Sequence, residues 1–258
     1  MKKIIFIMAM AICAIALVTS GVKIYEHAME AREQSQKFDD VLNMLEKSGK
    51  KGEKENSTEE LDTTKVPKMS ELWTLRKKNS DLVGWINIAN TRINYPVMQT
   101  KENRDYYINH NFEKEKSSYG VPYVDDKSNL DLPSDNIVIY GHHMNNGSMF
   151  TDIDRYNDKK FFESNRKVIF NTVNGENEYQ IIAVFRATVD TGTHKDFNFY
   201  RFTDAQIPDE FENYVNTCKG KSLYDTGVGA SYGDKLLTLV TCEYSQQNGR
   251  IVLLAKKV

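Results

Sequence analysis

The stretch LLTLVTCEYSQQNGRIVLLAKKV, residues 236–258, closes the chain and has the pattern of two apolar β-strands around a polar loop. Within the loop, Asn248-Gly249 is a turn signal that favours a hairpin. The first strand ends at Cys242 and the second begins at Arg250. In a hairpin these two residues lie opposite each other, with Cα atoms about 5 Å apart, so the guanidinium can reach the sulfur. The alternative is that Arg250 is a charge on an edge strand that extends into water.

The rest of the chain also favours a β-rich fold. Short runs of β-branched and aromatic residues are separated by turn signals, helices are few, and strands do not alternate regularly with helices. This pattern predicts a mostly antiparallel barrel or sandwich with peripheral helices. We expect helices at residues 71–79, with Ser70 as N-cap, and at residues 207–218, with Pro208 in the first turn. We expect the other strands at residues 82–88, 92–99, 121–126, 136–143, 167–173 and 178–189.

The composition is that of an ordinary globular protein. The chain has 258 residues, of which 40% are hydrophobic and 27% charged, which suits one domain of about 150–200 residues with appendages. The formal net charge is −2, and no nucleic-acid-binding motif is present. The charge therefore gives no indication of a nucleic-acid partner.

The N-terminus has the pattern of a membrane anchor. Lys2 and Lys3 precede residues 4–22, which carry no charge. A helix over this run spans about 30 Å, close to the hydrocarbon thickness of a bilayer. The two lysines favour a cytoplasmic N-terminus, which places the remainder of the chain outside the cell. A cleaved signal peptide is the competing interpretation, and it exports the same residues.

The segment after this anchor divides into a helix and a linker. Residues 24–46 carry apolar side chains at helical spacing, whereas residues 47–65 are charged and poor in apolar side chains. Three parts are therefore expected: a cytoplasmic start and transmembrane anchor (1–23), a helical stalk and charged linker (24–65), and an extracellular globular domain (66–258).

Cys242 and His142 are the candidates for chemistry. A cysteine at a strand end becomes a nucleophile when a neighbouring cation or base stabilises its thiolate. His142 follows the apolar strand of residues 136–141 and thus has the same placement as Cys242. It precedes the cysteine by 100 positions, an order that differs from papain-like proteases. A structural histidine is the alternative for His142.

Metal binding and a disulfide are the competing roles for these residues. His142 and His143 point to opposite faces of an extended chain, and no spaced metal motif accompanies them, so we expect neither a metal nor another cofactor. In an exported domain, Cys218 and Cys242 can form a disulfide. Such a bridge would make Cys242 structural.

Taken together, these motifs resemble the sortases, the cysteine transpeptidases on the surface of Gram-positive bacteria. The segment TLVTC, residues 238–242, matches the T-L-x-T-C motif of that family, another strand ends in YGHH, and an arginine begins the last strand. The stretches DLVGWINIANTRINYPVMQ, YYINHNF and GVPYVDD, with a helical insertion around residues 205–220, are similar to class B sortases in particular. The resemblance covers about residues 66–258. It implies a closed sortase-type β-barrel with peripheral helices, an N-terminal helix and a helical insertion before the last two strands.

The resemblance assigns His142, Cys242 and Arg250 as the catalytic residues. One departure concerns KENRDYYI, residues 101–108, which differs from the D-N-x-Y-Y-L pattern of class B members. No substrate contact is therefore assigned to Asn103. Candidates for substrate contact are three neighbours of these residues, Tyr140, Thr241 and Glu243. For Tyr140, a core aromatic is an equal alternative.

The resemblance also implies a reaction and its partners. The enzyme would cleave a C-terminal sorting motif of N-P-x-T-x type in exported proteins, through an acyl-thioester on Cys242. It would transfer the product to an amine of a cell-wall peptide or peptidoglycan precursor, while the N-terminal anchor holds it in the membrane. Two alternatives stay open: a sortase that polymerises pilin subunits, and a non-catalytic anchored barrel that binds a partner and contains a Cys218–Cys242 disulfide.

Overall fold

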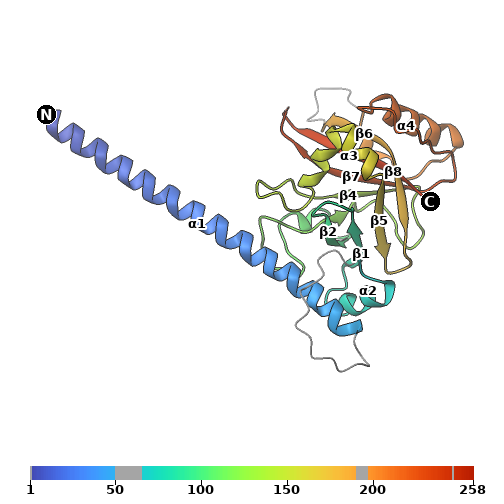
Figure 1. Cartoon of the computed structure of the whole chain (residues 1–258), viewed down its shortest axis with the longest axis horizontal. Coiled ribbons are helices and arrows are strands. Elements are labelled where there is room, and N and C mark those ends of the chain that lie inside the picture. The colour runs from blue at the N-terminus through green and yellow to red at the C-terminus, as the bar shows by residue number, and fades with distance from the viewer. Residues whose placement is uncertain (1, 50–65, 190–196, 246) are drawn as a thin grey trace. The chain divides into compact units, whose positions relative to one another are not determined.

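The computed structural model of the chain describes residues 2–49, 66–189, 197–245 and 247–258 (Figure 1). It divides into two compact units, Met1–Asp40 and Val41–Val258. The second unit contains every strand of the described residues.

The N-terminal helix α1 (Lys2–Gly49) is continuous over 48 residues. It contains a stretch that is long and apolar enough to cross a membrane, judged by length and composition. The helix predicted at residues 24–46 is confirmed. It also extends over residues 47–49, which we predicted as linker. No proline or glycine interrupts the helix there before its last residue, so the helix continues. The rest of that linker, residues 50–65, lies outside the described residues.

The strands of the described residues form one closed barrel in the order β1-β2-β3-β4-β7-β8-β6-β5, and β5 pairs with β1 to close it. The fold class implied by the resemblance is therefore confirmed, and a sandwich is excluded. The strands are β1 (Leu82–Asn87), β2 (Asn94–Met98), β3 (Tyr123–Val124), β4 (Asn136–Tyr140), β5 (Lys167–Thr172), β6 (Glu178–Thr188), β7 (Leu236–Glu243) and β8 (Gly249–Lys257).

Strands β4 and β7 form a parallel pair within this mostly antiparallel barrel. Their register runs from Asn136 opposite Leu236 to Tyr140 opposite Val240. Because parallel strands end at the same edge of a sheet, the residues that follow Tyr140 and Val240 lie together at one end of the barrel. The two strand ends singled out in the sequence are thus neighbours in space.

The closing hairpin is also confirmed. Strands β7 and β8 are antiparallel, with Cys242 directly opposite Arg250. On its other side β8 pairs with β6, where Arg250 lies opposite Ala187. Arg250 is therefore on an interior strand, and the alternative of an edge-strand charge is wrong.

Helix α4 (Pro208–Gly220) is the predicted insertion between β6 and β7, with Pro208 in its first turn as expected. Phe211, Val215 and Cys218 on this helix are fully or almost fully buried in one cluster with barrel residues. This burial of apolar area fixes α4 against the barrel wall. The other short helices are α2 (Met69–Arg76), η1 (Tyr106–Ile108), η2 (Thr151–Asn157), α3 (Lys159–Ser164) and η3 (Phe199–Arg201).

The start of α2 differs from the prediction. Ser70 was expected as N-cap of a helix at residues 71–79, but the helix starts at Met69 and Lys68 occupies the N-cap position. The Glu71 carboxylate accepts the backbone N–H of Lys68 at 2.8 Å. A glutamate three residues after the cap satisfies a free backbone donor, which explains the earlier start.

Several strands are shorter than predicted, β3 and β4 among them. The strand expected at residues 121–126 is reduced to β3, because the Asp125 carboxylate accepts the backbone N–H of Lys127 at 3.0 Å and the chain turns. The strand expected at residues 136–143 ends at Tyr140, so both histidines lie beyond its ladder.

The close packing of β1 on β5 yields a first testable prediction, the loss of stability in Gly84→Ala. A Cβ on Gly84 would lie 2.5 Å from the carbonyl oxygen of Asn171 and 2.7 Å from the Phe170 ring. Overpacking of this kind costs about 1–3 kcal/mol, so the urea midpoint of the protein in detergent should fall. Gly220→Ala is the matched control, because its Cβ would have no neighbour within 4 Å. An unchanged midpoint for Gly84→Ala would contradict this packing.

Candidate active site

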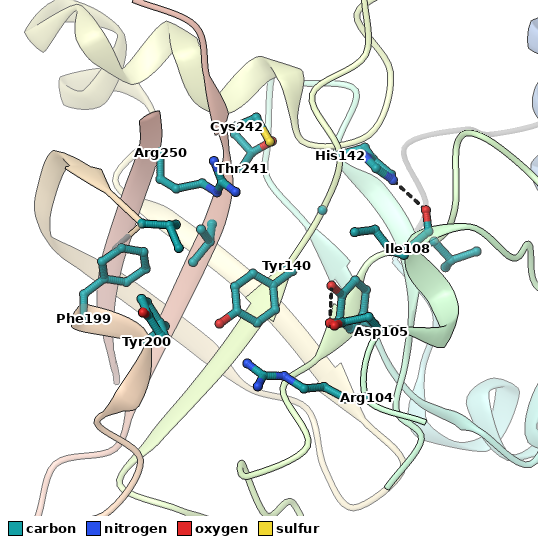
Figure 2. A pocket seen from close by; sticks show the side chains of 15 residues that line it. Arg104, Asp105, Ile108, Tyr140, His142, Phe199, Tyr200, Thr241, Cys242 and Arg250 are labelled. Atoms are coloured by element: carbon teal, nitrogen blue, oxygen red, sulfur yellow. Dashed lines mark hydrogen bonds between the residues drawn. The ribbon is translucent and has the colours of Figure 1, made fainter. Parts of the chain in front are cut away.

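A cavity of about 340 Å³ opens at the end of the barrel where β4 and β7 finish (Figure 2). Its walls include side chains from β3, β4, β7 and β8, from the η1 segment and from the η3 segment. The three residues predicted to be catalytic all line it: His142, Cys242 and Arg250.

Cys242 and Arg250 are held by the hairpin ladder. The two residues are direct partners in the β7–β8 register, and both face the cavity. The Arg250 Nη1 donates to the carbonyl of Gly249 at 2.8 Å, which fixes the guanidinium close to its own strand. A guanidinium in this position provides positive charge beside the thiol and N–H donors for an oxyanion.

His142 is fixed by backbone and side-chain hydrogen bonds. The N–H of the preceding residue, Gly141, donates to the carbonyl of Val240 on β7 at 3.1 Å. The carbonyl of His142 accepts the Phe150 N–H at 2.9 Å. Its Nε2 lies 2.6 Å from the carbonyl oxygen of Ile108 (Figure 2). Because a carbonyl only accepts, Nε2 carries the proton and Nδ1 is the nitrogen that can exchange one.

Ile108 was missed in the sequence. It lies at the end of η1, more than thirty positions before His142, and it acts through its backbone. A backbone carbonyl that orients a histidine leaves no side-chain pattern in the sequence, so this contact could not be predicted. The stretch YYINHNF, which begins at Tyr106, entered the sequence argument only through the resemblance.

The structure brings Tyr140 and Thr241 to the cavity but not Glu243. Tyr140 lines the cavity, and its hydroxyl lies 3.4 Å from Asp125 Oδ2. Thr241 also lines it and is buried, and its Oγ1 has no hydrogen-bond partner among the described residues. The Glu243 carboxylate instead accepts the Ser245 backbone N–H at 2.9 Å and its hydroxyl at 2.7 Å, in a neighbouring hollow shared with Cys242.

Charged residues that the sequence did not reveal form another part of the cavity wall. Arg104 lines the cavity, and its guanidinium contacts Asp125 at 3.3 Å and Asp126 at 3.5 Å. Burial raises the pKa of Asp125, while the positive charge of Arg104 acts to lower it. Burial also raises the pKa of Tyr140 well above its usual range, so its hydroxyl stays protonated. The only sequence signal was that residues 101–108 depart from the family pattern.

The two cysteines of the barrel unit are free. Cys218 is fully buried on α4, whereas Cys242 is partly exposed at the cavity. The disulfide required by the non-catalytic alternative is therefore wrong. Burial raises the pKa of the Cys218 thiol to about 12, so this thiol is unreactive at neutral pH.

In the part of the chain that the structure describes, no group of three or more His, Cys, Asp or Glu side chains is placed to hold a metal ion. The cavity wall brings together a thiol, an imidazole and a guanidinium. A thiol with these neighbours can attack a carbonyl carbon and form an acyl-thioester.

Comparisons with known proteins identify the family that the chain resembles. The Sortase domain family matches residues 86–258. Sortase B of Listeria monocytogenes is 36% identical over 192 residues, which cover 73% of this chain and 74% of that protein. Sortase B of Staphylococcus aureus is 34% identical over 185 residues, covering 71% and 72%.

Solved structures show the same likeness. A Staphylococcus aureus sortase B–substrate complex superposes with a TM-score of 0.75 at 26% identity, covering 89% of this chain and 98% of that one. Sortase B of Clostridium perfringens superposes with a TM-score of 0.63 at 32% identity, covering 72% and 98%.

The different environments of the two thiols predict selective alkylation. In a Cys13→Ser background, iodoacetamide at pH 8 should modify Cys242 and leave Cys218 unmodified, because pH 8 lies far below the pKa of about 12 of the buried thiol. Peptide mass spectrometry of the folded protein measures both sites. Denatured protein is the control, in which both thiols should react. Equal labelling in the folded protein would show that α4 does not protect Cys218.

Proposed function

The chain belongs to the sortase family, as a class B sortase, and from this premise we propose that it cleaves a C-terminal sorting motif of exported proteins through an acyl-thioester on Cys242. A class B sortase is a cysteine transpeptidase of the cell wall. The observation that carries the proposal is the direct register pairing of Cys242 with Arg250 in a cavity that His142 also lines.

In the first half-reaction the Cys242 thiolate attacks the carbonyl carbon of the scissile peptide bond. Arg250, with a backbone N–H next to Cys242, stabilises the negative charge that develops on the carbonyl oxygen. The C–S bond forms, the C–N bond breaks, and His142 donates its proton to the leaving amine. The Ile108 carbonyl holds the ring through Nε2, so we assign this proton to Nδ1.

In the second half-reaction an amine of a cell-wall peptide or peptidoglycan precursor attacks the thioester. His142 takes the proton from this amine, a new C–N bond forms, the C–S bond breaks and the Cys242 thiolate is released. The product is the exported protein joined to the cell wall. A pilin subunit as acceptor would define the other candidate function, and the choice of amine in the assay below distinguishes the two.

We propose that an extended peptide of the N-P-x-T-x type occupies the cavity. Its volume of about 340 Å³ lies in the range of ligand pockets, and its lining is mostly apolar with a few polar groups. We assign Tyr140 and Thr241 to contact with this peptide, because both line the cavity. Glu243 we assign to the order of the loop after β7, since Ser245 occupies its carboxylate.

We further propose that α1 anchors the enzyme in the cell membrane by a single pass. Its apolar stretch is long enough to span a bilayer, and Lys2 and Lys3 favour a cytoplasmic N-terminus. The barrel would then lie outside the cell, where exported substrates and cell-wall amines meet.

Substitution of the three catalytic residues tests the mechanism. Peptides with each position of the N-P-x-T-x motif varied are incubated with the full chain and a panel of peptide amines, and products are measured by mass spectrometry. Cys242→Ala should abolish cleavage. His142→Ala should lower kcat by about 10²–10⁴-fold and Arg250→Ala by about 10²–10³-fold.

Arg250→Lys is the matched control, because it keeps the positive charge but lacks the planar set of guanidinium N–H donors. It should recover only part of the kcat that Arg250→Ala loses. Cleavage that survives Cys242→Ala would contradict the acyl-thioester. Transfer to a lysine of a pilin peptide in preference to cell-wall amines would favour the pilin-polymerising function.

The unpartnered hydroxyl of Thr241 gives a further prediction. Thr241→Val keeps the shape and removes a buried donor that has no partner among the described residues, so stability should be unchanged or slightly higher. If the hydroxyl binds the peptide, kcat/KM should fall about tenfold, as expected for a lost hydrogen bond of roughly 1.4 kcal/mol. Thr241→Ser, which keeps the hydroxyl, is the control. Full activity in Thr241→Val would show that the hydroxyl does not contact substrate.

A further inference from the structure

His143 faces away from the cavity that His142 lines. Consecutive side chains of an extended chain point to opposite faces, and His143 is absent from the cavity wall. Its Nε2 donates to Asp154 Oδ2 on η2 at 2.7 Å. The side chain of His143 is only 14% exposed. The residue that follows the catalytic histidine is thus fixed to a carboxylate.

Tyr244, two residues after Cys242, contacts the same histidine. Its hydroxyl donates to the His143 carbonyl at 3.3 Å, and the two rings meet edge to face with centroids 5.1 Å apart. The backbone hydrogen bond from Gly141 to Val240 closes the ladder between the two catalytic strands. Beyond that point, Tyr244 joins the chain that carries His142 to the chain that carries Cys242. We call His143, Asp154 and Tyr244 the clasp.

The charges around the clasp place it in the field of the active site. Burial raises the pKa of Tyr244, and negative charge at Cys242 and Asp154 raises it further, while Arg250 acts to lower it. The Tyr244 hydroxyl is thus within electrostatic range of Cys242 and Arg250. None of the three clasp residues lines the peptide cavity.

The clasp keeps polar atoms in unfavourable surroundings. His143 Nδ1 and Asp154 Oδ1 are buried and have no hydrogen-bond partner among the described residues. A buried unpaired donor or acceptor costs stability, and a pair whose carboxylate side chain is 38% exposed adds little to it. Stability alone therefore does not explain the pair.

We infer that the clasp is a positioning unit that sets the separation of His142 from Cys242. The inference rests on the proposed function. Catalysis by a paired thiol and imidazole depends steeply on geometry, and a misplacement of about 1 Å can lower the rate about a hundredfold. Loss of the clasp therefore lowers kcat and leaves the binding of the donor peptide unchanged.

The test compares His143→Leu, His143→Gln and Tyr244→Phe in the full chain with Cys13→Ser, in detergent. His143→Leu removes the donor to Asp154 and should lower kcat for peptide cleavage about 10–100-fold, with KM within about twofold. His143→Gln should recover most of kcat, because its amide nitrogen can reach the position of Nε2 and donate to Asp154. Tyr244→Phe keeps the ring contact and loses one hydrogen bond, so kcat should fall about three- to tenfold.

Asp135→Asn is the matched control. Asp135 pairs with Lys235 at 2.8 Å, just before the first residues of β4 and β7 and therefore at the opposite end of these strands from Cys242. This variant also loses the charge of a paired carboxylate, and its kcat should match that of the parent. Melting temperatures are measured for every variant, and Tyr244→Phe with His143→Gln carries the test if His143→Leu does not fold.

The rate of Cys242 alkylation by iodoacetamide gives a readout that needs no substrate. If the clasp holds His142 close enough to the thiol to support the thiolate, His143→Leu should slow alkylation several-fold, and His143→Gln should restore it. A parent enzyme that cleaves no peptide would refute the proposed function, while the alkylation rates would still test the clasp. Unchanged kcat and alkylation in His143→Leu, a loss confined to KM, or failure of His143→Gln to rescue would overturn the inference.

Discussion

The active site depends on the parallel pairing of β4 with β7. This pairing brings together two strand ends that lie 100 positions apart in the sequence, and it does so at the same edge of the barrel. A buried hydrogen bond of 2.8 Å from Thr238 Oγ1 to Asn136 Oδ1 joins the two strands inside the barrel. Strand β8 then adds Arg250 on the far side of β7. The arrangement of His142, Cys242 and Arg250 is therefore a consequence of strand order and register.

The features that depend on nearby residues could be predicted from the sequence. The closing hairpin follows from two apolar runs around an Asn-Gly turn, and the α4 insertion follows from its spacing and from Pro208. Longer-range features could not be predicted. Neither the parallel partner of β7 nor the Ile108 carbonyl that orients His142 has a local signal, because both arise from segments that meet only in the folded barrel. The start of α2 was missed because Glu71, three positions after Lys68, satisfies the backbone there.

Polar groups are distributed unevenly around the cavity. Arg104 has carboxylate partners, whereas the hydroxyl of Thr241 is buried without a partner among the described residues. A folded domain normally pairs its buried polar atoms, so each exception calls for an explanation. The unpaired group lies directly before the nucleophile in the chain. The cavity thus combines a preformed charged wall with a wall whose hydrogen bonding the peptide would complete.

The placement of β8 between two strands has a consequence for how such an enzyme can diverge. A shift of one residue in a β-ladder turns every side chain to the opposite face, and β8 would have to break its register with β6 and β7 together. Arg250 is thus protected against slippage. Tyr244 and Ser245 lie beyond this ladder, so a substitution of either residue can change the surroundings of Cys242 without a change of register. The register thus fixes the pairing of Cys242 with Arg250, whereas the residues after Glu243 can change independently of it.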